Sequence, residues 1–239
     1  MPTTITAVDP DLPTVRAATP DLPVDLDADP RTELRRQTEV YLALGLPELL
    51  GVTGQAFRSA LLPLADLVEE SAAGAGDAGA DRGDAVPFVL VLTGDYDLND
   101  AVPAMRRAGR TGVSVIDREE LATYRDVAGV EVPGGGAYLL TGIDTGSNYC
   151  GTRPEDALLA VRAAGRTPLT ITEGVALTIL RPDMLRPNRC YSLMGSRATN
   201  QRVPAVWISD RRAKLGWCWD RNPHTWLGAA SARDRVAAG

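Results

Sequence analysis

Apolar residues recur at helical spacing in the first part of the chain and form short strand-like runs in the rest. From Thr32 the pattern predicts a helix that ends at Gly45 and Pro47. A second helix is predicted after Thr53, with a bend at Pro63 because proline disrupts the helical hydrogen bonds. Its apolar stripe consists of Phe57, Leu61, Leu64 and Val68.

The segment after residue 84 alternates predicted strands with predicted helices. Continuous apolar residues predict a buried strand over 88–92, and further strands are expected over 112–116 and 137–143. Asn99 or Asp100 is expected to cap a short helix. Capping-box spacings begin two more helices, at Asp117 with Glu120 and at Thr170 with Glu173, and Pro154 begins another that ends before Gly165.

Three antiparallel strands are predicted at the C-terminal end, over 189–196, 202–209 and 214–219, joined by short polar turns. Together these elements predict a single α+β domain. N-terminal helices come first, followed by a mixed sheet that ends in a three-strand antiparallel meander.

Two segments lack the apolar periodicity of a folded element. Residues 1–30 carry six prolines and six aspartates against one arginine, and this composition predicts a disordered tail in front of a domain spanning 31–239. Residues 71–84, SAAGAGDAGADRGD, are expected to be a flexible connector within that domain.

The composition excludes several classes of partner. Once the acidic tail is set aside, residues 31–239 carry 24 basic and 25 acidic side chains, which argues against binding to nucleic acid or to an anionic membrane surface. No apolar run approaches the roughly 20 residues of a membrane span, and the N-terminus has no signal-like pattern, so a cytoplasmic protein is expected. Three cysteines without a C-x-x-C motif are expected to be reduced.

The segment 203–228 holds all four tryptophans and the only histidine of the chain. Strand alternation places Leu215, Trp217 and Trp219 on one face, which is expected to be core. The other face carries Lys214, Gly216, Cys218 and Asp220 and is expected to line a cleft.

Cys218 and His224 are the candidate catalytic residues, because a histidine that turns back across Asn222 and Pro223 would stabilise a thiolate. Such a dyad predicts that the thiol pKa lies below its reference value of about 8.5. Small core cysteines are the alternative interpretation. The candidate ligand-binding residues are Asn222, Lys214, Arg197 and Trp226.

Metal and cofactor sites are not predicted. A zinc site formed by Cys150, Cys190, Cys218 and His224 lacks the paired ligand spacing of a zinc ribbon. The run from Asp95 to Asp100 resembles the start of a calcium loop, but its sixth position is aspartate where an EF-hand has glycine. Helix capping and turn formation suffice to explain these aspartates.

Several stretches resemble an uncharacterised family of actinobacterial proteins, a domain of unknown function. They include RPEDAL at 153–158, GRTPLTI at 165–171, LGWCW at 215–219 and NPHTWLG at 222–228. The resemblance covers the chain after the tail and implies no activity.

Two classes of function remain open from the sequence. The first is a small-molecule site, binding or enzymatic, near the C-terminal Trp/Cys/His segment. The second is a non-catalytic interaction module in which the same Trp-rich segment contacts another protein. A deep pocket that touches both Cys218 and His224 would favour the first, and a flat apolar patch the second.

Overall fold

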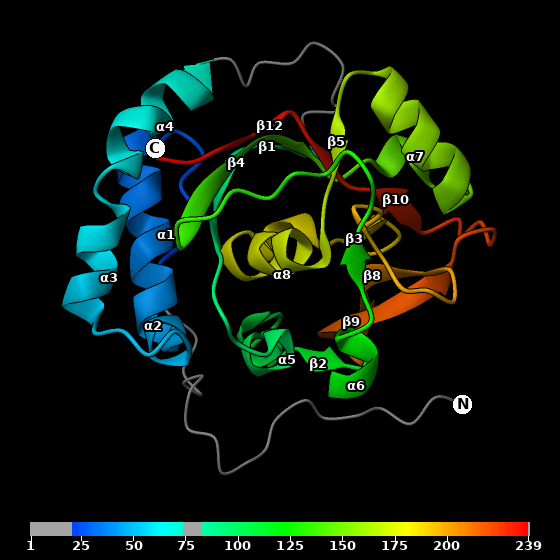
Figure 1. Ribbon diagram of the computed structural model, residues 1–239, viewed down its shortest axis with the longest axis horizontal. Coiled ribbons are helices and arrows are strands. Elements are labelled where there is room, and N and C mark those ends of the chain that lie inside the picture. The colour runs from blue at the N-terminus through cyan, green and yellow to red at the C-terminus, as the bar shows by residue number, and fades with distance from the viewer. Residues whose placement is uncertain (1–20, 74–82, 239) are drawn as a thin grey trace.

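A computed structural model describes residues 21–73 and 83–238 of the protein (Figure 1). In this part of the chain, two five-stranded sheets flank a central helix, α8 (Ile171–Leu180), which packs against strands of both. The N-terminal helices lie together along one side of the molecule (Figure 1). The arrangement is an α+β domain, as the sequence predicts.

The N-terminal helices follow the predicted pattern with one difference. They are α1 (Pro30–Leu44), α2 (Leu46–Leu49), α3 (Gly54–Leu61) and α4 (Leu64–Ala73). Asp29 caps α1 by accepting from the Thr32 amide at 3.0 Å, and Gly45 ends it with a left-handed backbone, φ 79°. The predicted second helix is divided at Leu62 and Pro63 into α3 and α4, so the break is sharper than the predicted bend.

The first sheet is antiparallel, with the order β1-β4-β11-β5 and with β12 also paired to β4. Its strands are β1 (Ala85–Leu92), β4 (Ala137–Asp144), β5 (Thr167–Pro168), β11 (Ser231–Ala232) and β12 (Asp234–Val236).

The second sheet has the order β10-β6-β8-β9-β2. The antiparallel succession β6-β8-β9 is the predicted meander, and β10 and β2 pair in parallel at its two edges. Its strands are β2 (Val113–Ser114), β6 (Cys190–Ser192), β8 (Arg202–Ser209), β9 (Arg212–Trp219) and β10 (Leu227–Ala229).

Apart from the ten-residue helix α7 (Pro154–Ala163), the remaining elements are two to four residues long. The short helix α5 (Leu98–Ala101) is capped by Asp97, two residues before the earlier of the two predicted positions. The elements are β3 (Arg125–Asp126), paired with β7 (Ser196–Arg197); the helices α5 (Leu98–Ala101), α6 (Arg118–Leu121) and α7 (Pro154–Ala163); and the 3₁₀ helices η1 (Val102–Ala104), η2 (Ser147–Tyr149) and η3 (Pro182–Met184).

The predicted tail and connector fall largely outside the described residues. Residues 1–20 of the tail and 74–82 of the connector are not described, so their predicted disorder stays a prediction. Within the described part of the tail, Leu22 packs against the core, and its carbonyl accepts a hydrogen bond from Arg36 at 3.3 Å.

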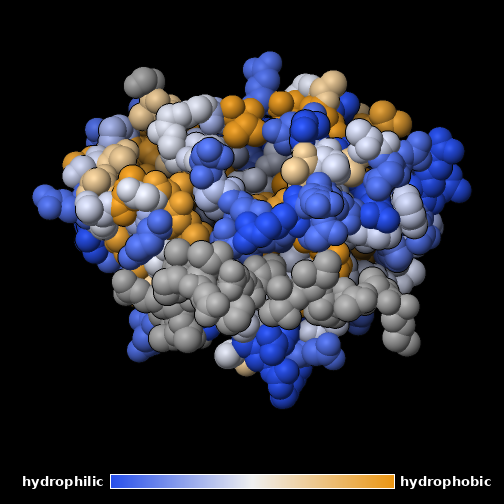
Figure 2. Space-filling view, turned by 60° about the horizontal axis from the view of Figure 1, so that its bottom comes forward, coloured by the Kyte–Doolittle hydropathy of each residue, from blue (hydrophilic) through white to orange (hydrophobic). Residues whose placement is uncertain are grey.

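The surface mixes hydrophilic and hydrophobic residues. On the face shown in Figure 2, apolar patches are interrupted by hydrophilic side chains. Among the described residues, no helix combines the length and apolarity needed to cross a membrane.

Helix α8 is buried along its length. Nine of its ten residues are buried, and Thr172 is the exception. The sequence ITEGVALTIL is apolar on nearly all sides, which is the pattern of a helix surrounded by protein. Its capping box is present as predicted, with Thr170 accepting from the Glu173 amide and Glu173 accepting from the Thr170 amide.

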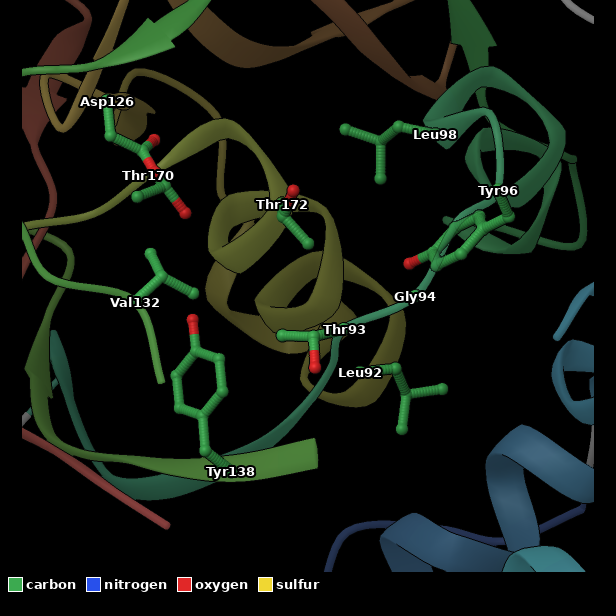
Figure 3. A pocket seen from close by; sticks show the side chains of 10 residues that line it. All are labelled: Leu92, Thr93, Gly94, Tyr96, Leu98, Asp126, Val132, Tyr138, Thr170 and Thr172. Atoms are coloured by element: carbon green, nitrogen blue, oxygen red, sulfur yellow. The ribbon is translucent and has the colours of Figure 1, made fainter. Parts of the chain in front are cut away.

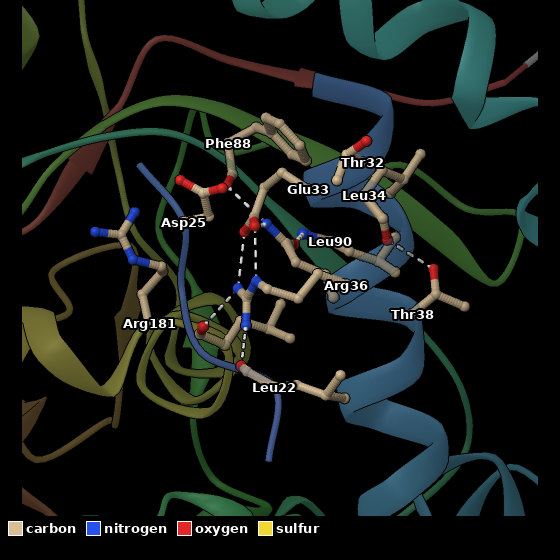
Figure 4. A network of polar contacts seen from close by, with 12 residues as sticks. Leu22, Asp25, Thr32, Glu33, Leu34, Arg36, Thr38, Phe88, Leu90 and Arg181 are labelled. Carbon is tan, nitrogen blue, oxygen red and sulfur yellow. Dashed lines mark hydrogen bonds and ion pairs between the residues drawn. The ribbon is translucent and has the colours of Figure 1, made fainter. Parts of the chain in front are cut away.

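Helix α1 covers the free edge of strand β1 with side-chain hydrogen bonds (Figure 4). The buried Gln37 amide accepts from the Leu90 N–H at 2.7 Å and donates to the Phe88 carbonyl at 3.2 Å. Tyr41 donates to the Leu90 carbonyl at 2.7 Å. These contacts replace a neighbouring strand, so the edge of the sheet is satisfied inside the protein.

The same helix also caps the C-terminal end of α8. Arg36 donates to the carbonyl of Leu180, the last residue of α8, at 3.0 Å and forms a two-point ion pair with Glu33 (Figure 4). Glu33 in turn accepts from Gln37 at 2.8 Å. One polar network therefore joins the edge of the first sheet to the end of the central helix.

We predict that Gln37→Leu destabilises the protein by about 2–4 kcal/mol, because it leaves the buried Leu90 N–H and Phe88 carbonyl without partners, at about 1–3 kcal/mol each. Urea unfolding measures the change. Arg35→Leu is the control, because it adds the same side chain at an exposed position of α1. Equal stability of the two variants would show that the Gln37 bonds contribute nothing.

Candidate functional site

Two adjoining cavities open beside the N-terminus of α8, and we call them together the α8 cleft (Figure 3). The inner cavity has a volume of about 190 Å³ and the outer one about 540 Å³. Tyr96, Leu98, Asp126 and Thr172 line both, so the two spaces adjoin at these four side chains.

The walls of the cleft come from segments far apart in the sequence. The inner wall is formed by Leu92, Thr93, Gly94, Tyr96, Leu98, Asp126, Val132, Tyr138, Thr170 and Thr172. The outer wall adds Asp95, Asp97, Arg118, Leu121, Ala122, Tyr124, Arg125, Ile171 and Ser196. Figure 3 shows Tyr96 on one side of the inner cavity and Asp126 and Tyr138 on the other.

The first turn of α8 is held by groups that surround the cleft. The Ser196 hydroxyl accepts from the Ile171 amide at 3.0 Å and donates to the Asp126 carboxylate at 3.2 Å. The pairing of β3 with β7 places these two side chains together, because Asp126 lies opposite Ser196. Among the described residues, the Thr172 N–H has no acceptor, although it belongs to the same turn.

A buried ion pair lies directly behind this turn. Glu173 is fully buried, and its two carboxylate oxygens accept from Arg235 of β12 at 2.6 and 2.8 Å. The Tyr138 hydroxyl donates to Glu173 at 2.7 Å, and burial together with this carboxylate raises the pKa of Tyr138. The hydroxyl of Tyr138 is therefore protonated and fixed where its ring lines the cavity.

Tyr96 and Asp126, two titratable groups of the cleft, have raised pKa values, and the Arg118 guanidinium is paired with carboxylates. Burial raises the pKa of Tyr96 to about 12. Asp126 is exposed at the mouth, yet neighbouring atoms displace part of its hydration and raise its pKa, with the Ser196 hydrogen bond opposing this effect. Arg118 pairs with Asp97 and Asp100, each at 2.5 Å.

The predicted site residues of the C-terminal segment divide into two groups. In the first, Arg197 pairs with Asp220 at 2.7 Å, and both influence Cys218 electrostatically. Cys218 is 5% exposed, and burial, reinforced by the Asp220 carboxylate, raises the pKa of its thiol to about 12. The predicted fall of this pKa is therefore wrong, because desolvation disfavours the thiolate more than Arg197 stabilises it.

The second group gathers around the aromatic rings at the end of the chain. The His224 ring lies 5.1 Å from the Trp226 ring, and its Nε2 is 3.5 Å from the Asn222 amide nitrogen. Trp226 contacts Trp207 edge to face at 6.2 Å, and Lys214 lies opposite Trp207 in the β8–β9 pair. Partial burial lowers the pKa of His224.

The two groups are not joined into a site. In the part of the chain that the structure describes, no hydrogen bond links Cys218 to His224, and neither residue lines the α8 cleft. A catalytic role for Cys218 and His224 stays a prediction. That role requires a lowered thiol pKa, whereas the pKa of Cys218 is raised.

The predicted faces of β9 are wrong near its end. Cys218 and Gly216 lie on the face expected to be open, and both are buried. Trp219, which was expected in the core, is 46% exposed. Trp217 and Trp219 contact each other at 5.1 Å, and the Arg202 guanidinium lies 3.8 Å from the Trp217 ring.

Sequence reasoning missed the cleft residues Tyr96, Asp126, Thr172 and Ser196. Only two features of the sequence indicate this part of the molecule. Polar residues follow the buried strand β1, and a capping box begins an unusually apolar helix. Pairing of the two-residue strands β3 and β7 could not be predicted, because neither strand has a pattern of its own.

Comparison with known protein families identifies the family of this chain. The model of a family of unknown function, DUF5701, matches residues 40–238. The chain belongs to DUF5701. The matched range contains every residue of the α8 cleft and the whole C-terminal Trp-rich segment, so both are parts of the DUF5701 domain.

The comparisons add no activity to the DUF5701 assignment. No curated protein and no solved structure matches the chain. No group of three or more potential metal-ligating His, Cys, Asp or Glu side chains is found among the residues described.

We predict that Cys218 resists alkylation in the native protein. Its thiol is buried and its pKa is raised to about 12, so little thiolate forms at pH 8. Iodoacetamide labelling with peptide mapping should modify the partly exposed Cys150 first and Cys218 only after unfolding. Fast labelling of Cys218 that slows in His224→Ala would restore the dyad.

We also predict that alanine substitution lowers the free energy of unfolding by different amounts at Trp217 and Trp219, whose rings contact each other. Trp217→Ala should destabilise the domain by about 2–3 kcal/mol, below the usual range for a core tryptophan because the ring is only partly buried. Trp219→Ala should cost less than about 1 kcal/mol because nearly half of the side chain is exposed. Chemical unfolding compares the variants, and equal costs would mean that Trp219 is part of the core after all.

Proposed function

We propose that this protein binds a small polar molecule in the α8 cleft. The observation that carries the proposal is the position of Thr172. It is the one residue of the buried helix α8 that is not buried, and it lines both cavities, while its own N–H has no acceptor among the described residues. A helix N-terminus that opens into a cavity offers a directed donor to a ligand.

The size and lining of the cleft support this proposal. The outer cavity, at about 540 Å³, lies within the range of about 300–1,000 Å³ that is typical of small-molecule sites. Three side chains that carry hydroxyl groups, Thr93, Tyr96 and Thr172, line the inner cavity together with Asp126 (Figure 3). This lining is more polar than that of a usual ligand pocket, which consists mostly of apolar side chains, so it favours a polar ligand.

An enzymatic use of the site would centre on Asp126. Partial loss of hydration raises the pKa of its carboxyl group, and the side chain lies where a ligand would contact it. We propose binding as the function and Asp126 as the group that would act in a reaction.

The alternative function is contact with another protein through the Trp-rich C-terminal segment. One observation favours it, the exposed ring of Trp219 beside Trp217 and Arg202. Aromatic and arginine side chains are enriched where proteins bind one another. The two functions differ in their response to Trp219→Ala, which would leave ligand binding in the α8 cleft unchanged. Location in the cytoplasm and an actinobacterial family origin stay predictions.

We predict that a metabolite library contains compounds that raise the melting temperature through the α8 cleft. A ligand at 100 times its Kd stabilises the native state by about 2.7 kcal/mol, which corresponds to about 5–10 °C for a domain of this size. Tyr96→Phe and Asp126→Asn should reduce the shift, because each removes a polar group that lines both cavities.

His224→Ala is the control, since His224 does not line the cleft. Shifts that disappear in His224→Ala but persist in both cleft variants would move the site to the C-terminal segment. A complete absence of stabilising compounds would contradict small-molecule binding.

A further inference from the structure

The charged side chains of the α8 cleft leave an excess of carboxylate. Three aspartates and two arginines line the outer cavity. Arg118 is engaged by Asp97 and by Asp100, which lies outside the lining. Arg125 donates to two backbone carbonyls, those of Ala122 and Tyr124, at 2.6 and 2.7 Å. Neither arginine pairs with Asp95 or Asp126.

Asp95 and Asp126 are therefore the carboxylates of the cleft without a basic partner. Asp126 accepts only the neutral hydroxyl of Ser196, and no hydrogen bond or ion pair of Asp95 occurs among the described residues. The groups that act on Asp126 from the neighbouring elements are Ser196 of β7, Glu173 of α8 and Arg235 of β12. Arg235 is already neutralised by its two bonds to Glu173, so it compensates Asp126 weakly.

Neutral donors and an apolar wall define the rest of the cleft. The Thr172 N–H and the hydroxyls of Thr93 and Thr172 have no protein acceptor in the described chain. Leu92, Leu98 and Val132 line the inner cavity beside them. A ligand that satisfies this lining needs acceptor oxygens in the inner cavity and a positive charge towards the outer one.

We propose that the ligand is a small hydroxylated amine, whose ammonium group lies between Asp95 and Asp126 and whose hydroxyl oxygens reach Thr172 and Thr93. This inference rests on the proposed binding function of the α8 cleft. The positive end of α8 does not favour an anionic ligand instead, because the Asp126 carboxylate already lies beside that first turn, joined to the Ile171 amide through the Ser196 hydroxyl. An anion would meet the carboxylates of both Asp95 and Asp126, and the charge of Arg125 offsets only one of them.

The test uses three probes of nearly equal size that differ in charge: glucosamine, glucose and glucuronate. Thermal shift and isothermal titration at pH 6.5 compare them at millimolar concentration. We expect glucosamine to bind at least tenfold more tightly than glucose and glucuronate to bind least. Compounds of the metabolite library that act through the cleft are sorted by charge in the same way.

Variants separate the charge effect from loss of structure. Asp126→Asn and Asp95→Asn should each weaken glucosamine binding about tenfold and weaken glucose binding much less, while Asp126→Glu should retain part of the preference. Glu70→Gln is the matched control, because Glu70 is an exposed carboxylate of α4 outside the cleft. Circular dichroism confirms that each variant is folded.

The outcomes distinguish this inference from the proposed function. Equal or tighter binding of glucose or glucuronate, or library ligands of the cleft that are neutral or anionic, would overturn the amine class and leave the binding site in place. Failure of all three probes and of every library compound would overturn both. A glucosamine preference that survives Asp126→Asn and Asp95→Asn would also overturn the inference, because the charge would then be read elsewhere.

Discussion

Complete burial of helix α8 is the constraint on which the rest of the structure depends. A helix leaves unpaired N–H groups at one end and unpaired carbonyls at the other, and a buried helix cannot leave them to water. At the N-terminal end, Thr170 and Ser196 accept the amides of the first turn. At the C-terminal end, Arg36 of α1 donates to the Leu180 carbonyl. Segments far apart in the sequence, α1 and β7, therefore meet at α8.

The buried ion pair of Glu173 and Arg235 helps to fix the position of the N-terminal end of helix α8. Two charges without water are costly unless every remaining polar group is satisfied, and here Tyr138, Thr167 and the Pro168 carbonyl complete the set. Removal of one partner from such a pair costs about 3–5 kcal/mol. Because the contacts join β4, β5, α8 and β12, the wall behind the cleft is a rigid part of the domain.

Local signals in the sequence predict much of the fold but little of the site. The capping box at Thr170, the apolar run of β1 and the meander were predicted because each depends on residues close together in the chain. Alternation along β9 correctly placed Cys218 and Trp219 on opposite faces of the strand. It cannot tell which face other elements cover, so the buried and exposed faces were predicted the wrong way round at that end. The cleft depends on the β3–β7 pairing across about 70 residues, for which the sequence carries no local pattern.

The position of the cleft follows from the same constraint that shapes the fold. Thr170 and Ser196 accept two amides of the first turn of α8, but Thr172 lines the cleft, where β1 ends and the chain turns through Tyr96 to Asp97. In folded proteins the local sequence preferences mostly agree with the fold, and the exceptions tend to occur at functional sites. Here the departure is a polar, partly open end on an otherwise enclosed apolar helix. The cysteine at 218 shows the contrast: it is buried and its polar neighbours pair with each other, so its surroundings are those of a structural residue.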